Sequence, residues 1–187
     1  MEEGIILLLI LFLIFNVGIG EVTFPQIDKE DINVEEEKIT GNKEISNTSE
    51  NNDLYKVFKE SIQGNAKINL ETKNGNIYSY FEESIDGNPG ININSINGDI
   101  YIWFQKKITG NVSMNVKTSS GDIHVKFEEK VLGNPNINLK TSKGDIIFYN
   151  DRSAIKKINI SINSVRVRYK ETLPNKAFNN WFKRNFL

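Results

Sequence analysis

Apolar and polar residues alternate along most of the chain between residues 58 and 149, and this pattern restarts every 23 residues. Each repeat contains two alternating runs separated by a glycine, and one aliphatic residue in the segment that leads to the next repeat. Alternation with a period of two, rich in β-branched and aromatic residues, predicts strands that bury one face. The inward positions we expect are Ile68, Leu70, Ile91, Ile93, Met114, Val116, Ile137 and Leu139 in the first run; Ile77, Phe81, Ile100, Ile102, Phe104, Ile123, Val125, Phe127, Ile146 and Phe148 in the second; and Ile39, Ile62, Ile85, Ile108 and Val131 between repeats.

Two columns of glycine keep the 23-residue period without an insertion: Gly64, Gly87, Gly110 and Gly133, and Gly75, Gly98, Gly121 and Gly144. One repeat cannot bury its own apolar face, so a short fixed period predicts coils that stack. The sequence therefore predicts an all-β fold, a single-stranded parallel β-helix (β-solenoid) at residues 39–172. We expect about six coils, right-handed, with glycine where φ is positive or where coils pass closely.

A chain of hairpins is the rival interpretation, because Asn97-Gly98 would suit a two-residue turn. The residue before the turn glycine is Asn in only two of the four repeats, and hairpins would tolerate changes in loop length. We therefore favour the solenoid.

The two ends of the chain differ from the repeats. Residues 1–20 are mostly apolar and predict a signal peptide, or an uncleaved signal anchor because Glu2 and Glu3 stand where basic residues are usual. Membrane anchoring would then run through residues 4–20. Residues 21–38 predict a linker or N-terminal cap. Residues 173–187 predict a short helix that caps the last coil or lies on a membrane, with four aromatic residues at helical spacing, Phe178, Trp181, Phe182 and Phe186.

Composition and charge limit the kinds of partner, metal site and catalytic site that the chain could have. The net charge of −1 with interspersed signs argues against nucleic acid as a partner. Without cysteine there is no disulfide or thiolate site, and the one histidine, His124, cannot form a multi-histidine metal site. The paired acidic residues recur with the repeat, which favours a solvated rim over an acid/base pair; they are Glu82, Glu83, Glu128 and Glu129. We therefore expect no enzyme, no catalytic residues, no cofactor and no metal.

Outward positions of the second run form an aromatic stripe centred on Tyr78, Tyr80, Tyr101 and Trp103. Exposed apolar patches usually mark interaction surfaces. These four residues are the candidate site for a glycan or protein partner. The alternative is that the stripe reflects only the preference of strands for aromatic residues and that the C-terminal tail covers it.

Three polar columns also follow the repeat. The aspartate column after the turn glycine (Asp53, Asn76, Asp99, Asp122 and Asp145) could bind calcium, but we favour the interpretation that it accepts turn amides. The hydroxyl column (Thr72, Ser95, Thr118, Thr141 and Ser164) has inward parity, so we expect it near a corner of the core. The asparagine column (Asn65, Asn88, Asn111 and Asn134) predicts a structural ladder.

The core segments TSSGDIHVKF, TSKGDIIFY and SINGDIYIW resemble those of adhesin families of bacteria and archaea. The resemblance covers residues 39–169. It implies a secreted or anchored β-solenoid with a binding or structural role, and it supplies no catalytic residues.

These observations predict an extracytoplasmic protein, secreted or anchored to the cell membrane, that acts as a surface binding or scaffold module. A carbohydrate-active enzyme on the same fold and a purely structural, self-associating rod are the alternatives.

Overall fold

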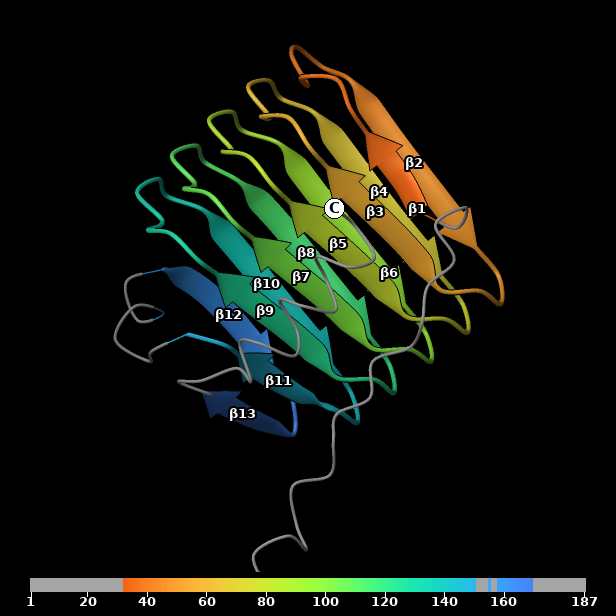
Figure 1. Cartoon of the computed structure of the whole chain (residues 1–187). Coiled ribbons are helices and arrows are strands. Elements are labelled where there is room, and N and C mark those ends of the chain that lie inside the picture. The colour runs from red at the N-terminus through yellow and green to blue at the C-terminus, as the bar shows by residue number, and fades with distance from the viewer. Residues whose placement is uncertain (1–31, 151–154, 156–157, 170–187) are drawn as a thin grey trace, which may run out of the picture.

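The computed structural model describes residues 32–150, 155 and 158–169, and every element bounded within them is a β-strand (Figure 1). Sheet 1 contains β1 (Ile32–Glu35), β3 (Leu54–Phe58), β5 (Ile77–Phe81), β7 (Ile100–Phe104), β9 (Ile123–Phe127), β11 (Asp145–Phe148) and β13 (Arg166–Tyr169), in that order. Sheet 2 contains β2 (Glu44–Ser49), β4 (Lys67–Thr72), β6 (Gly90–Ser95), β8 (Ser113–Thr118), β10 (Asn136–Thr141) and β12 (Asn159–Asn163).

All neighbouring strands within the two sheets are parallel, and in every pair except the last of sheet 1 each residue pairs with the residue 23 positions later. Ile77 is the partner of Ile100, and Tyr80 is the partner of Trp103. A third, narrow side is formed by single parallel bridges that link Ile39, Ile62, Ile85, Ile108 and Val131. The fold is therefore a parallel β-solenoid of about six turns with about 23 residues per turn. The hairpin interpretation is wrong, because the segments on either side of Gly98 belong to different sheets.

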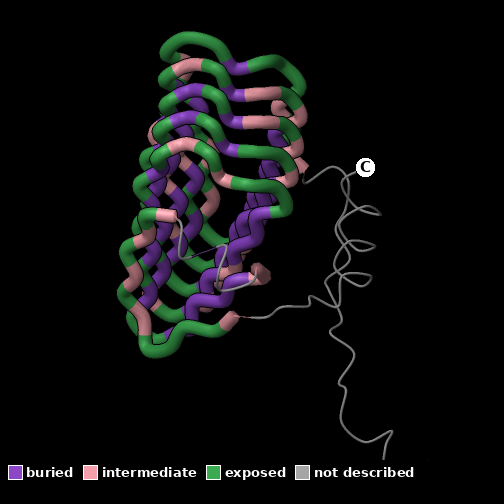
Figure 2. Tube along the Cα trace, turned by 90° about the vertical axis from the view of Figure 1, so that its left-hand side faces the viewer, coloured by how far each residue is buried: buried purple, intermediate pink, exposed green. Residues whose placement is uncertain are grey.

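The core lies between the two sheets, and buried positions recur at the same place in successive coils (Figure 2). Phe58, Phe81, Phe104 and Phe127 stack in one inward column with ring centroids 4.7, 4.9 and 5.1 Å apart. Burying one such side chain contributes about 1.5–3 kcal/mol. Each coil of this column therefore buries its phenylalanine against the same residue of the next coil.

The glycine columns mark the corners where successive coils pass closely. A Cβ atom placed on Gly110 would lie 1.6 Å from the carbonyl oxygen of Gly87, and one on Gly98 would lie 1.9 Å from that of Gly75. Positive φ, the other reason given for these glycines, is wrong for both columns, because Gly41 is the only described residue that adopts it.

The ends of the stack depart from the pattern in two ways. β1 lies within the segment predicted as a linker or cap, and it pairs with β3 in the 23-residue register. In the last coil β12 keeps that register on β10, whereas Arg166 of β13 pairs with Asp145, 21 residues earlier, because the turn before β13 is shorter. The predicted signal segment (1–20) and C-terminal helix (173–187) lie outside the described residues. No helix in the described part of the chain could cross a membrane.

Candidate functional site

The four predicted site residues lie together on the outer face of sheet 1, two on β5 and two on β7. Tyr78 and Tyr101 stack with their ring centroids 4.8 Å apart and their planes 4° apart. This ring column continues through Tyr55, His124 and Tyr149, with centroid distances between 4.3 and 5.8 Å and angles up to 15°. We call these five residues the ring column. Because each ring faces the next, the column presents ring edges outward, and the hydroxyls of Tyr55 and Tyr101 lie along one side beside Asp53 and Asp99.

Tyr80 and Trp103 form a second, parallel line with a different geometry. Their rings meet edge to face, 5.2 Å apart at 62°. Lys126 of β9 extends this line, with its ammonium group 4.4 Å from the Trp103 ring, a favourable cation–π distance. The hydroxyl of Tyr80 donates a hydrogen bond to Oε1 of Gln105. We call the two lines together the aromatic face.

The aromatic face is buried at its centre, while Tyr101, His124 and Tyr149 of the ring column are half-buried. Tyr78, Tyr80 and Trp103 are only 5%, 3% and 6% exposed, and Val57 at the same level of the face is fully buried. Sheet 2 has the same geometry, yet its outward side chains are exposed or half-buried. Stacking between coils therefore does not account for the burial of the aromatic face. Sheet 2 lies on the inner side of sheet 1, so no described strand lies over this face (Figure 1).

Burial changes the acidity of the tyrosines. It raises the pKa of Tyr78, Tyr80 and Tyr101 well above the usual value, and nearby carboxylates add to the effect. The pKa of Tyr149 is raised to about 12 for the same first reason, burial, with Asp122 adding to it. All four phenols are therefore neutral near pH 7 and act as hydrogen-bonding groups rather than as bases.

Carboxylates border the aromatic face on both sides. On one side the hydroxyls of Tyr55 and Tyr101 donate to Asp53 and Asp99 at 3.2 and 3.3 Å. On the other side Glu82, Glu83 and Glu128 act electrostatically on Tyr80. Burial is also the main cause of the raised pKa of Glu82. The face is thus a largely aromatic strip between two acidic borders, with Lys126 in it paired to Glu128 at 2.7 Å.

The aspartate column connects one coil to the next. In each coil Oδ1 accepts a hydrogen bond from the backbone N–H at the same position one repeat later; Asp99 to Asp122 is 2.8 Å and Asp122 to Asp145 is 2.7 Å. At the end of the column, Arg168 and Arg166 contact Asp145 at 2.7 and 3.2 Å. The interpretation that this column accepts turn amides is confirmed, and no group of carboxylates and imidazoles among the described residues has metal-site geometry.

The hydroxyl column fills the same corner from inside. The hydroxyl of Thr118 accepts the N–H of Gly121 at 3.2 Å and donates to the carbonyl oxygen of Gly98 at 2.9 Å. Ser95 and Thr141 repeat this pair of bonds in their own coils. The prediction that these hydroxyls point inward is confirmed for Thr72, Ser95, Thr118 and Thr141, which are buried, whereas Ser164 is half-buried and donates to the carbonyl oxygen of Arg166. The asparagine ladder is also present, since the N–H of Asn111 donates to Oδ1 of Asn88 at 3.1 Å.

Sequence reasoning missed the polar end of the core. Lys56 occupies the inward column of Ile102 and Val125, is 2% exposed, and hydrogen-bonds Asn33 while its ammonium lies 3.6 Å from Glu35. Desolvation lowers the pKa of Lys56, opposed by Glu35. The 23-residue register, extended back to residue 56, was the signal that could have revealed it.

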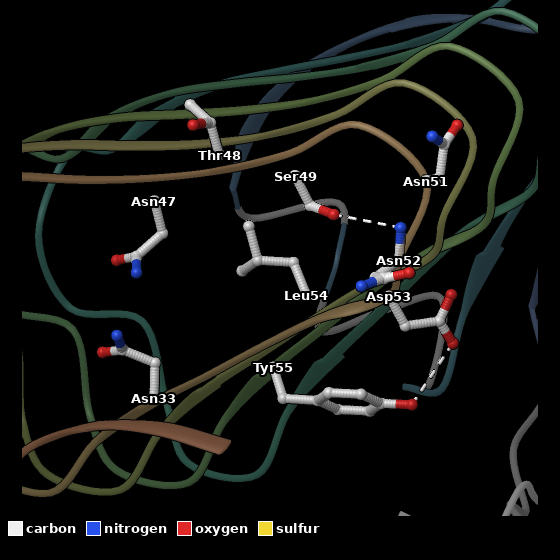
Figure 3. Close-up of a pocket in the computed structure, with 9 residues that line it drawn as sticks. All are labelled: Asn33, Asn47, Thr48, Ser49, Asn51, Asn52, Asp53, Leu54 and Tyr55. Atoms are coloured by element: carbon white, nitrogen blue, oxygen red, sulfur yellow. Dashed lines mark hydrogen bonds between the residues drawn. The ribbon is translucent and has the colours of Figure 1, made fainter. Parts of the chain in front are cut away.

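A polar pocket of about 540 Å³ lies at the same end of the solenoid, at the turn between β2 and β3 (Figure 3). Amides, hydroxyls and one carboxylate dominate its lining, which consists of Asn33, Asn47, Thr48, Ser49, Asn51, Asn52, Asp53, Leu54 and Tyr55. Two of these polar groups are already engaged, since Ser49 accepts the N–H of Asn52 and Asp53 accepts the hydroxyl of Tyr55. The lining suits hydrogen bonding to a polar group and contains no nucleophile paired with a base.

These features define the class of the protein as a parallel β-solenoid with one polar and one aromatic outer face. No protein-family model, no curated protein and no solved structure matches the chain.

Proposed function

We propose that the protein is an exported cell-surface binding or scaffold module without catalytic activity, and that the aromatic face is its binding surface. The observation that supports this proposal is the register of the aromatic face. Rings repeat along a rigid sheet at the spacing of the strands, so their positions are fixed before any partner arrives. A preorganised surface loses little conformational entropy on binding.

The geometry favours a protein segment over a glycan. A sugar packs on the open face of an aromatic ring, but the ring faces of Tyr78 and Tyr101 are turned toward each other, 4.8 Å apart. What the ring column offers is a flat apolar surface of ring edges with hydroxyls along one side. Aromatic and basic residues of a peptide fit such a surface between acidic borders.

The resemblance to adhesin families supports the location and the binding role. The proposal includes a right-handed solenoid and a helix at residues 173–187. It also includes residues 1–20 as an export signal or membrane anchor, with the solenoid outside the cytoplasm.

Binding to a glycan array and to an array of aromatic-basic peptides, paired with an assay for released reducing sugars, tests the proposal. We expect peptide binding that Trp103→Ala abolishes and that Leu132→Ala, at an exposed position, leaves unchanged. Release of reducing sugars would show instead the carbohydrate-active enzyme. Binding that is insensitive to Trp103→Ala would place the binding surface elsewhere.

A further inference from the structure

The outer face of sheet 1 raises a question that sheet 2 does not: what covers it. Tyr55, Tyr78, Tyr80 and Trp103 are 3–6% exposed and the other rings of the aromatic face are half-buried, whereas Asn115, Lys117 and Asn138 at outward positions of sheet 2 are exposed. Lys126, whose side-chain nitrogen lies 2.7 Å from Glu128, is only 9% exposed. Side chains on the surface of a single open sheet do not reach such values by stacking alone, as sheet 2 demonstrates.

We propose that residues 170–187 of the same chain cover the aromatic face, so that the protein carries its own occupant of the binding surface. The inference rests on the proposed function only in naming what the face does once it is uncovered. The choice of this segment follows from its charge, its length and the place where it leaves the solenoid.

Charge separates the two segments that could reach the face. Residues 170–187 contain four basic residues and one acidic residue, whereas residues 1–31 contain six acidic residues and one basic residue. The borders of the face are acidic, formed by Asp53, Asp99 and Asp122 on one side and by glutamates on the other. Opposite charges attract across such a boundary and like charges repel. The basic segment is therefore the complementary one.

Length and position agree with this choice. The tail continues from Tyr169, the last residue of β13, which is the end strand of sheet 1 (Figure 1). From β13 to β5 there are four strand spacings, or about 19 Å. Residues 173–187 would span about 22 Å as a helix, and the whole tail would reach about 60 Å when extended. Either conformation brings the tail across Trp103 and Tyr80.

The apolar residues of the tail match the face chemically. Phe178, Trp181, Phe182 and Phe186 fall at helical spacing. They would form one apolar stripe, and the neighbouring Lys183 and Arg184 would reach the acidic borders. Aromatic rings packed edge to face attract one another beyond the effect of the area they bury. The same composition explains why the tail on its own resembles a peptide that such a face would bind.

Acrylamide quenching of tryptophan fluorescence tests the proposal in the full chain. The chain has two tryptophans, so Trp181→Phe leaves Trp103 as the only reporter while it keeps an aromatic ring in the tail. In this background we compare two double variants. One is Phe178→Asp/Phe182→Asp, and its matched control is Asn179→Asp/Asn180→Asp. Both pairs add the same charge to the same segment.

We expect Trp103 to be shielded in the Trp181→Phe parent and in the control, and the quenching constant to rise several-fold in the Phe178→Asp/Phe182→Asp variant. Far-UV circular dichroism checks that the solenoid stays folded. A second double variant, Lys183→Glu/Arg184→Glu, should also raise the quenching of Trp103. Adding Glu82→Lys and Glu83→Lys to this variant should restore the shielding of Trp103. A quenched Trp103 in the parent, or shielding that survives loss of the tail aromatics, would overturn the proposal.

The peptide array then separates the two proposals. Quenching reports the cover without any ligand, so it succeeds or fails independently of what the face binds. Stronger peptide binding by the uncovered variant than by its control supports both proposals. If Trp103 becomes accessible and no peptide binds, the covering tail stands and the binding function fails.

Discussion

Replacing Gly98 by alanine tests whether the backbones of successive coils are in direct contact at the corner. The added Cβ would lie 1.9 Å from the carbonyl oxygen and 2.4 Å from the carbonyl carbon of Gly75, and 2.9 Å from the amide nitrogen of Asn76. All three atoms are backbone atoms of the preceding coil. No rotamer change can relieve the overlap, so the two coils must separate at this corner by more than about 1 Å out of a spacing of about 4.8 Å.

Separation would also break the hydrogen bonds of the corner. The N–H of Gly98 donates to the hydroxyl of Ser95 at 2.9 Å, and this hydroxyl donates to the carbonyl oxygen of Gly75 at 3.0 Å. Overpacking costs about 1–3 kcal/mol, and each buried polar group left without its partner costs about 1–3 kcal/mol. We therefore expect Gly98→Ala to lower the free energy of unfolding by at least about 3 kcal/mol.

Gly90 provides the matched control, because a Cβ at this position of β6 would meet nothing within 4 Å. Gly90→Ala should raise the free energy of unfolding by about 0.5–1 kcal/mol, since alanine restricts the unfolded chain. Urea unfolding followed by far-UV circular dichroism measures both variants beside the parent. A Gly98→Ala loss no larger than the about 0.5 kcal/mol typical of surface changes would refute the backbone-contact argument.

Three further predictions follow from the polar columns and the buried tyrosines. Thr118→Val should cost about 1–3 kcal/mol, because the N–H of Gly121 and the carbonyl oxygen of Gly98 lose a buried partner; Ser113→Val on the exposed face is the control, and equal losses in urea unfolding would contradict the corner assignment. Asp122→Ala should lower the melting temperature, because the N–H of Asp145 loses its acceptor. Asp122→Asn should retain the melting temperature, since the side-chain oxygen of Asn76 accepts the equivalent N–H of Asp99. A rise in the melting temperature of the parent on adding calcium would speak against this role. A tyrosine whose pKa is raised by folding stabilises the protein fully below its unfolded pKa near 10, and this contribution is lost as the pH rises through the folded value. Stability should therefore fall above pH 10, and Tyr78→Phe should reduce the slope by up to about 1.4 kcal/mol per pH unit; an unchanged slope in urea titrations at pH 9–12 would contradict it.

Most of the inward half of this structure could be predicted from the sequence, because most inward positions carry the same type of residue in each repeat. Ile77 over Ile100 and Phe81 over Phe104 follow once the period is known, since a shift by one residue would turn both columns out of the core. The corner hydroxyls follow from the same parity. The glycines show the limit of this reasoning, because a glycine indicates either positive φ or close approach, and only the three-dimensional structure distinguishes the two.

The outward half could be predicted only in part. Parity places Tyr78 and Trp103 on the outer face, but it says nothing about what packs against that face. The stacking of the ring column, which turns ring faces toward one another, depends on side-chain rotamers that the sequence does not specify. No position was predicted for Lys56, because its charge suggests an outward side chain, although the register puts it in the core. The 21-residue register of the last coil was not predicted, because the turn glycine that marks the repeat is absent there.

The two arginines of β13 bear on whether copies of this rod could join end to end into filaments. Along the stack each aspartate accepts the N–H of the following coil, but both carboxylate oxygens of Asp145 are held by Arg166 and Arg168. An incoming copy would have to break two ion pairs and approach exposed cations, and charged side chains of this kind are how natural sheets protect their edges. Polymer growth from the β13 end is thereby discouraged by the sequence itself.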